Sequence, residues 1–116
     1  INSFGNNDYL SMLNNIDVVV GNSSSGIIEA PFFKIATINI GTRQDGRVRS
    51  KSIIDCNGTM KSITNSFRKL NSSKFQRSLI KTKNPYYKKS SVKNIINVLK
   101  HTSLKNIHFK KFYNLI

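Results

Sequence analysis

The chain has 116 residues, one cysteine and a formal net charge of +14 at pH 7. That length suits one compact domain with a modest core, and no apolar run reaches the roughly 20 residues that a membrane-spanning helix needs. Because Cys56 is the only cysteine, no internal disulfide is possible, and with only two histidines beside it the sequence offers no metal-ligand cluster. A lone cysteine fits a reducing compartment, so we expect a cytoplasmic protein.

The net positive charge lies in the second half of the chain. Residues 1–55 contain five Lys or Arg and five Asp or Glu, whereas residues 56–116 contain fourteen Lys or Arg and no acid. A basic half can attract nucleic acid or anionic ligands. Aromatic residues are not regularly interleaved with the lysines, as a base-stacking surface requires. We therefore favour solvated, lysine-rich helix faces and keep a basic nucleic-acid-binding module as an alternative.

Helices and strands alternate along the first half of the chain, and helices fill the second. Three short runs rich in β-branched residues predict strands at residues 16–20, 36–40 and 52–56. Two helices are predicted to begin near Asn7 and Gly26, and three more follow caps at Thr59, at Ser72 or Ser73, and at Ser90 or Ser91. Pro31 should shorten or kink the second helix. The last helix is predicted to turn its apolar side chains inward: Val92, Ile95, Ile96, Val98 and Leu99.

The segment after the first predicted strand turns from a strand into a helix through residues 21–26 (GNSSSG). The first N–H groups of a helix have no partner within it and point outward with the positive end of the helix dipole, which suits a diphosphate. Three serines add hydroxyl donors, and Gly26 lets the backbone approach a ligand closely. In an open parallel sheet, ligands bind at this carboxyl edge.

Glu29, the only glutamate of the chain, lies one turn farther on. A carboxylate at that place can accept hydrogen bonds from both hydroxyls of a ribose, as acidic residues do in dinucleotide folds. Ordinary capping explains the same residues, because serines commonly cap helices and an early glutamate compensates the dipole. The pattern alone leaves a nucleotide site and a plain capped helix both open.

Two long motifs at a fixed separation are more specific. Residues 21–31 (GNSSSGIIEAP) and residues 37–47 (TINIGTRQDGR) together resemble the hydrolysing UDP-N-acetylglucosamine 2-epimerases. Close relatives in that family act on UDP-N,N'-diacetylbacillosamine. The resemblance covers about residues 8–57, and beyond residue 58 it rests on the order of the elements.

The resemblance implies an α/β fold, the Rossmann-like C-terminal half of a two-domain GT-B architecture that holds the nucleotide in the cleft between its domains. It assigns five residues to UDP: Ser23, Ser24 and Gly26 at the diphosphate, Glu29 at the ribose hydroxyls and Arg43 near the diphosphate. An arginine keeps its charge at any working pH, which suits that place. Arg47 and Arg49 are weaker candidates.

The family's reaction eliminates UDP from the sugar and adds water with inversion at C2, without a cofactor. The product is a free 2-epimeric N-acetyl sugar for sialic or legionaminic-type surface sugars. The acid–base carboxylates and the histidine of the family belong to segments outside this sequence, and His101 and His108 do not match them. We therefore expect no catalytic residue here and no turnover by the chain alone.

The same resemblance sets the expected organisation. Three strands are too few for a complete doubly wound domain and the chain begins with Ile1, so we expect a C-terminal piece of a longer protein. Residues 1–101 would be part of the nucleotide-binding domain, and residues 102–116 an arm docked on an N-terminal domain. The expected partners are the UDP-sugar and that domain, without nucleic acid or membrane, and a homo-oligomer is left open. The alternatives are another GT-B glycosyltransferase and a fragment without activity in the cell.

Overall fold

Three parallel strands form the centre of the molecule, which a computed structural model describes over residues 5–105. Their sheet order is β1 (Val18–Gly21), β2 (Ala36–Ile40) and β3 (Ile53–Cys56). The pairing runs from Val18–Ala36 to Gly21–Asn39 between β1 and β2 and is likewise parallel between β2 and β3, so all three strands run in one direction. The predicted parallel α/β sheet is confirmed, and its carboxyl ends lie side by side.

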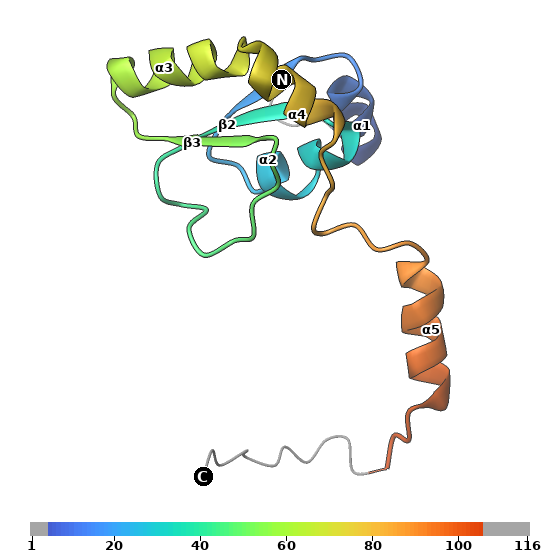
Figure 1. Cartoon of the computed structure of the whole chain (residues 1–116). Coiled ribbons are helices and arrows are strands. Elements are labelled where there is room, and N and C mark those ends of the chain that lie inside the picture. Colours follow the sequence, from blue (N-terminus) through green and yellow to red (C-terminus); the bar gives the residue numbers. More distant parts are fainter. Residues whose placement is uncertain (1–4, 106–116) are drawn as a thin grey trace.

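Each face of the sheet carries its own apolar cluster, because successive strand residues point to opposite sides. On one face, Ala36, Ile38 and Ile54 pack against α3 (Met60–Leu70) and α4 (Ser73–Ile80). On the other, Val19 packs with residues of α1 (Asn6–Leu13) and of the 3-10 helix η1 (Ala30–Phe33). Figure 1 shows α3 and α2 (Ser25–Ile28) on opposite sides of the strands.

Local signals place most helix ends as the sequence predicts. The Thr59 hydroxyl accepts a hydrogen bond from the N–H of Ser62, and the Ser72 hydroxyl accepts one from Phe75, so both predicted caps are confirmed. The helix predicted to begin near Gly26 divides at Glu29 into α2 and η1, and Pro31 lies in the first turn of η1. This is the shortening that a proline inside the pattern predicts.

The last helix, α5 (Ser91–His101), contradicts the prediction that its apolar side chains turn inward. The exposed fractions of these side chains range from 43% for Ile96 to 71% for Val92. Figure 1 shows α5 projecting away from the sheet and its helices. Periodicity shows that a helix has an apolar side but does not show which element covers that side. No element within residues 5–105 covers the apolar side of α5.

Two further predictions concern the end of the chain. Residues 106–116, most of the predicted arm over 102–116, lie outside the described residues, so its docking stays a prediction. The lysines of the second half within the described part are all exposed, as predicted for solvated helix faces. None of the helices in residues 5–105 has the length and apolar character needed to cross a membrane.

Gly26 of α2 lies directly against Thr37 of β2. Its carbonyl accepts a hydrogen bond of 2.8 Å from the Thr37 hydroxyl of β2, and the residue is buried. A Cβ at this position would lie 2.7 Å from Cγ2 of Thr37, closer than real Cβ contacts. Thr37 cannot rotate its methyl away without losing the hydrogen bond, because a β-branched side chain has few rotamers. Contact between helix and sheet therefore requires glycine here, whatever binds at the loop.

We predict that Gly26→Ala destabilises the intact protein by about 1–3 kcal/mol, the range for overpacking a buried contact. Thr37→Ser removes the clashing methyl and keeps the hydroxyl, so the same glycine substitution should be less destabilising in that background. Urea-unfolding midpoints of the two single variants and the double variant measure the difference. Gly58→Ala is the control, since a Cβ at Gly58 meets nothing within 4 Å. Equal destabilisation in both backgrounds would contradict the proposed clash.

Candidate functional site

The predicted site residues gather at the carboxyl edge of the sheet. Gly21, the last residue of β1, pairs with Asn39 of β2, which in turn pairs with Asp55 of β3. Residues 22–24, the serine loop, leave β1 at this edge, and residues 41–52, the arginine loop, leave β2 beside them. The arginine loop is the green segment that hangs below β3 in Figure 1. Parallel register alone therefore brings the two sequence motifs together.

Most main-chain N–H groups at the start of α2 are already hydrogen bonded, which corrects the prediction that they point outward unpaired. The N–H of Gly26 donates to the Ser23 carbonyl at 3.3 Å, and those of Ile27 and Ile28 donate to the Ser24 carbonyl at 3.0 and 2.9 Å. The helix spans only four residues, so its dipole is small. Donors for an anion must come mainly from side chains and from the loop itself.

Two of the three serines keep hydroxyl donors available. Ser25 is engaged with the Tyr9 hydroxyl of α1. The Ser24 hydroxyl has no hydrogen-bond partner within residues 5–105 and does not cap α2, although Ser24 holds the cap position. Ser23 is exposed and accepts a long 3.4 Å contact from the Ser25 N–H. Plain capping, the alternative interpretation, therefore holds only for the long contact of Ser23, because the Ser24 hydroxyl at the cap position accepts no N–H of α2.

Glu29 sits at the junction between α2 and η1, one helical turn from the serine loop. It is half-buried, and within the described part of the chain its carboxylate forms neither an ion pair nor a hydrogen bond. Within the described residues, its carboxylate accepts no hydrogen bond from an N–H of the serine loop, so Glu29 does not close a capping box with a serine. The N–H of Gly26 is already hydrogen bonded, and the residue lies against Thr37. Its contact with a diphosphate therefore stays a prediction.

The three arginines of the arginine loop, Arg43, Arg47 and Arg49, differ in what their side chains contact. Arg43 is exposed and forms no hydrogen bond or ion pair within residues 5–105. Arg49 is largely covered: its Nη1 donates to the carbonyls of Gln44 and Arg47 at 2.6 and 2.7 Å, and its Nε donates to both carboxylate oxygens of Asp55 at 3.2 and 3.1 Å. Arg49 therefore holds the loop, whereas the side chains of Arg43 and Arg47 are exposed and unpaired within residues 5–105.

The charge of Arg49 is secure because of these contacts. Its hydrogen bond to Asp55 raises the pKa of the guanidinium, the charges of Asp55 and Asp45 add to that, and burial opposes it. The ion pairs themselves are open to solvent, since half of the Asp55 side chain is exposed, and such pairs stabilise little. The hydrogen bonds to main-chain carbonyls are what fix the path of the loop.

Three polar residues of this edge, Asn39, Gln44 and Asp55, were not identified as site residues from the sequence. Asn39 donates to Asp55 at 2.6 Å, and Gln44 donates to the Asn22 carbonyl of the serine loop at 2.7 Å. A signal was present: Asn39 and Asp55 are polar residues inside apolar runs, at matching places in neighbouring parallel strands. Two such residues predict a polar contact where the strands end, but only once the register is known.

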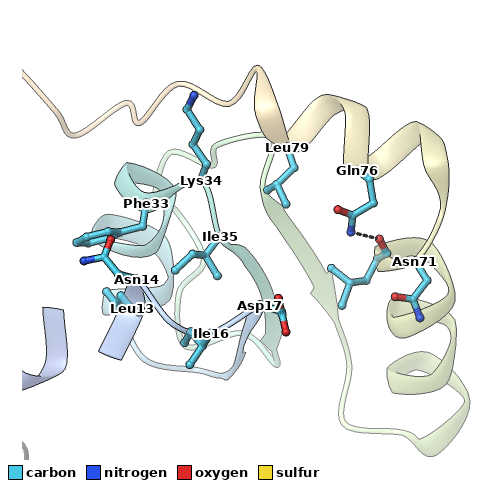
Figure 2. Close-up of a pocket in the computed structure, with 11 residues that line it drawn as sticks. Leu13, Asn14, Ile16, Asp17, Phe33, Lys34, Ile35, Asn71, Gln76 and Leu79 are labelled. Atoms are coloured by element: carbon cyan, nitrogen blue, oxygen red, sulfur yellow. Dashed lines mark hydrogen bonds between the residues drawn. The ribbon is translucent and has the colours of Figure 1, made fainter. Parts of the chain in front are cut away.

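A separate cavity of about 500 Å³ lies at the opposite, amino-terminal edge of the sheet. Figure 2 shows Ile16 and Asp17 before β1, Ile35 before β2, and Gln76 and Leu79 of α4 around it. None of the residues predicted to bind UDP lines it. Among the residues that the structure describes, no group of three or more His, Cys, Asp or Glu could hold a metal ion.

Comparison with known proteins gives consistent matches along the chain. A family model described as UDP-N-acetylglucosamine 2-epimerase matches residues 1–100. The chain is 41% identical over 114 residues to a GDP/UDP-N,N'-diacetylbacillosamine 2-epimerase (hydrolyzing) of Campylobacter jejuni and 39% identical over 114 residues to polysialic acid biosynthesis protein P7 of Escherichia coli. Each alignment covers 97% of this chain and 29% of the relative, so the likeness extends well beyond residue 58.

A UDP-N,N'-diacetylbacillosamine 2-epimerase (hydrolyzing) of Legionella pneumophila is 44% identical over 61 residues, which are 53% of this chain and 16% of that protein. The chain thus spans less than a third of the length of the curated relatives it matches.

We predict that Arg49→Lys loosens the arginine loop, because an ammonium cannot hold both oxygens of Asp55 and two carbonyls at once. Amide hydrogen exchange across residues 41–52 of the intact protein should become several-fold faster, while exchange in α3 stays unchanged. Arg43→Lys is the matched control in the same loop and should leave exchange as it is. Unchanged exchange in Arg49→Lys would show that the loop is held by something other than this guanidinium.

Proposed function

The chain belongs to the UDP-N-acetylglucosamine 2-epimerase family, and on that premise we propose that it forms the UDP-binding part of a hydrolysing UDP-sugar 2-epimerase. The observation that carries the proposal is the meeting of both sequence motifs at one carboxyl edge, where the side chains of Ser24 and Arg43 are unpaired within residues 5–105. We further propose that the parallel α/β unit is the C-terminal half of a two-domain GT-B fold. Its nucleotide would lie against this edge, as ligands do in open α/β sheets.

We assign the diphosphate to the hydroxyls of Ser23 and Ser24, to the Gly26 end of the loop and to the Arg43 guanidinium. The support is that Ser24 and Arg43 have no partner within residues 5–105 and come from loops that are tied together. Glu29 would accept the two ribose hydroxyls, since its carboxylate is likewise unpaired in the described part of the chain. These contacts reach the diphosphate and the ribose, which UDP and GDP share.

In the proposed reaction, UDP is eliminated from the sugar and water is then added with inversion at C2. Breaking the bond to the sugar leaves negative charge on the diphosphate, so hydroxyl and guanidinium donors aimed there stabilise the leaving group as charge develops. Substrates would be UDP-N-acetylglucosamine or UDP-N,N'-diacetylbacillosamine, for sialic or legionaminic-type sugars, in the cytoplasm. The acid and base would come from an N-terminal domain, so residues 1–116 alone should not turn over substrate.

A GT-B glycosyltransferase would use the same diphosphate and ribose contacts, so its products distinguish it. Incubation of the intact protein with each UDP-sugar, without an acceptor, should release UDP and the free 2-epimeric sugar in equal amounts. Release only after an acceptor is added would favour the glycosyltransferase. The 116-residue chain, assayed beside it, should release neither product.

Glu29→Gln tests the ribose contact. Loss of a hydrogen bond to a charged group removes about 1.5–3 kcal/mol, so the Kd of the intact protein for UDP should rise by roughly 10- to 150-fold in calorimetry. Asp17→Asn is the matched control, because it removes one negative charge at the amino-terminal edge.

A second ligand makes the Glu29 test specific. The unmodified protein should bind 2'-deoxy-UDP more weakly than UDP, and the Glu29→Gln variant should bind the two ligands with nearly equal affinity. If the variant still prefers UDP by the same factor, Glu29 does not contact the 2'-hydroxyl and the assignment is wrong.

A further inference from the structure

The side chain of Gln44 is buried in a loop whose neighbouring residues are exposed. Only 3% of it is accessible, whereas Arg43, Asp45, Gly46 and Arg47 are all exposed. Its Nε2 donates to the Asn22 carbonyl at 2.7 Å. Within residues 5–105 this is the one side-chain hydrogen bond that joins the arginine loop to the serine loop.

The orientation of the Gln44 amide follows from chemistry. Turning it over would place Oε1 against the Asn22 carbonyl, and two acceptors repel each other. In the observed orientation Oε1 is buried and has no hydrogen-bond partner in the described residues. A residue that only filled this space would be apolar, since an unpaired buried acceptor is unfavourable. The presence of an amide at this position is therefore explained by the one hydrogen bond that it donates, to the Asn22 carbonyl.

That bond fixes the direction of a donor in the serine loop. The peptide between Asn22 and Ser23 is planar and trans, so the Ser23 N–H points opposite to the Asn22 carbonyl. With the carbonyl turned toward buried Gln44, the Ser23 N–H turns away from it, and it has no main-chain acceptor within residues 5–105. Gly21, at φ +145°, gives the chain the bend that precedes this peptide.

The other end of Gln44 is anchored as firmly. Its own carbonyl accepts the 2.6 Å hydrogen bond from Nη1 of Arg49, and Arg49 is held by Asp55. Asp55 in turn accepts from buried Asn39 of β2 at 2.6 Å. The side chain that sets the serine loop is thus tied to the ends of β2 and β3, and Arg43 is the adjacent residue.

We propose that Gln44 is a positioning residue, which holds the Ser23 N–H and the Arg43 guanidinium at the spacing needed to bind one diphosphate. The proposal rests on the proposed UDP site and names what presents its donors. Gln44 itself does not touch the ligand, because its Oε1 is buried and its Nε2 is occupied. Its loss should therefore weaken diphosphate binding and leave nucleoside binding nearly unchanged.

The test compares two glutamines that form the same bond in different places. Gln76 Nε2 donates to the Leu70 carbonyl at 2.7 Å, the dashed line of Figure 2, at the amino-terminal edge. Gln44→Met and Gln76→Met remove the same hydrogen bond with little change in volume. Calorimetry on the intact protein, with UDP and with uridine, gives four affinities to set against those of the unmodified protein.

Gln44→Met should weaken UDP binding at least tenfold and uridine binding less than twofold, and Gln76→Met should change neither by more than twofold. An unchanged UDP affinity in Gln44→Met, or an equal loss for UDP and uridine, would overturn the positioning role. If Gln44→Met fails to fold by circular dichroism, Gln44→Asn replaces it, because it keeps the amide but shortens its reach. An unmodified protein that binds neither ligand would instead refute the proposed UDP site.

Discussion

The hydrogen bond from Gln44 to the Asn22 carbonyl joins the two loops on which the candidate site depends. Parallel strands deliver both loops to one edge, but register alone leaves each loop free to turn its donors in any direction. Here side-chain donors fasten main-chain carbonyls: Gln44 holds the serine loop, and Arg49 holds Gln44 and Arg47. In the proposed site, the Ser24 hydroxyl and the Arg43 guanidinium, both unpaired within residues 5–105, would meet the diphosphate from loops that are already fixed, which would lower the ordering needed on binding.

The core and the loops are built by different means. Apolar side chains of β2, such as Ile38, pack against α3 and α4, while Thr37 on the opposite face holds α2 through the Gly26 carbonyl. Toward the carboxyl edge the same strand carries Asn39 instead of an apolar residue, and polar contacts replace packing. The apolar residues that stabilise the fold and the polar residues of the candidate site therefore lie at different positions along β2, so substitutions at the edge need not disturb the core.

Much of this arrangement follows from the sequence, because strand runs, serine and threonine caps and the parallel order are local or pattern signals. The residues assigned to UDP were found through two motifs, yet their physical roles were not all as the pattern indicated. Gly26 is small because of Thr37, and the N–H groups of α2 are paired within the turn. Asp55 accepts hydrogen bonds from Arg49 and leaves Arg43 without an acidic partner within residues 5–105. The sequence does not show which arginine is held, because the position of Asp55 is set by the register of β3 against β2.

The apolar side of α5 could not be placed from its periodicity, since that signal does not identify a partner. The chain spans 29% of its relatives' length, and the catalytic groups of the proposed reaction are assigned to sequence outside it. In the proposed reaction, residues 1–116 would bind the leaving group, and an N-terminal domain would select the sugar.

A crystal structure of the intact protein with UDP tests this account most directly. It should show the diphosphate against Ser23, Ser24 and Arg43, the ribose hydroxyls on Glu29, and the bond from Gln44 to Asn22 kept. UDP bound in the cavity beside Asp17 and Gln76, or a diphosphate out of reach of both loops, would contradict it.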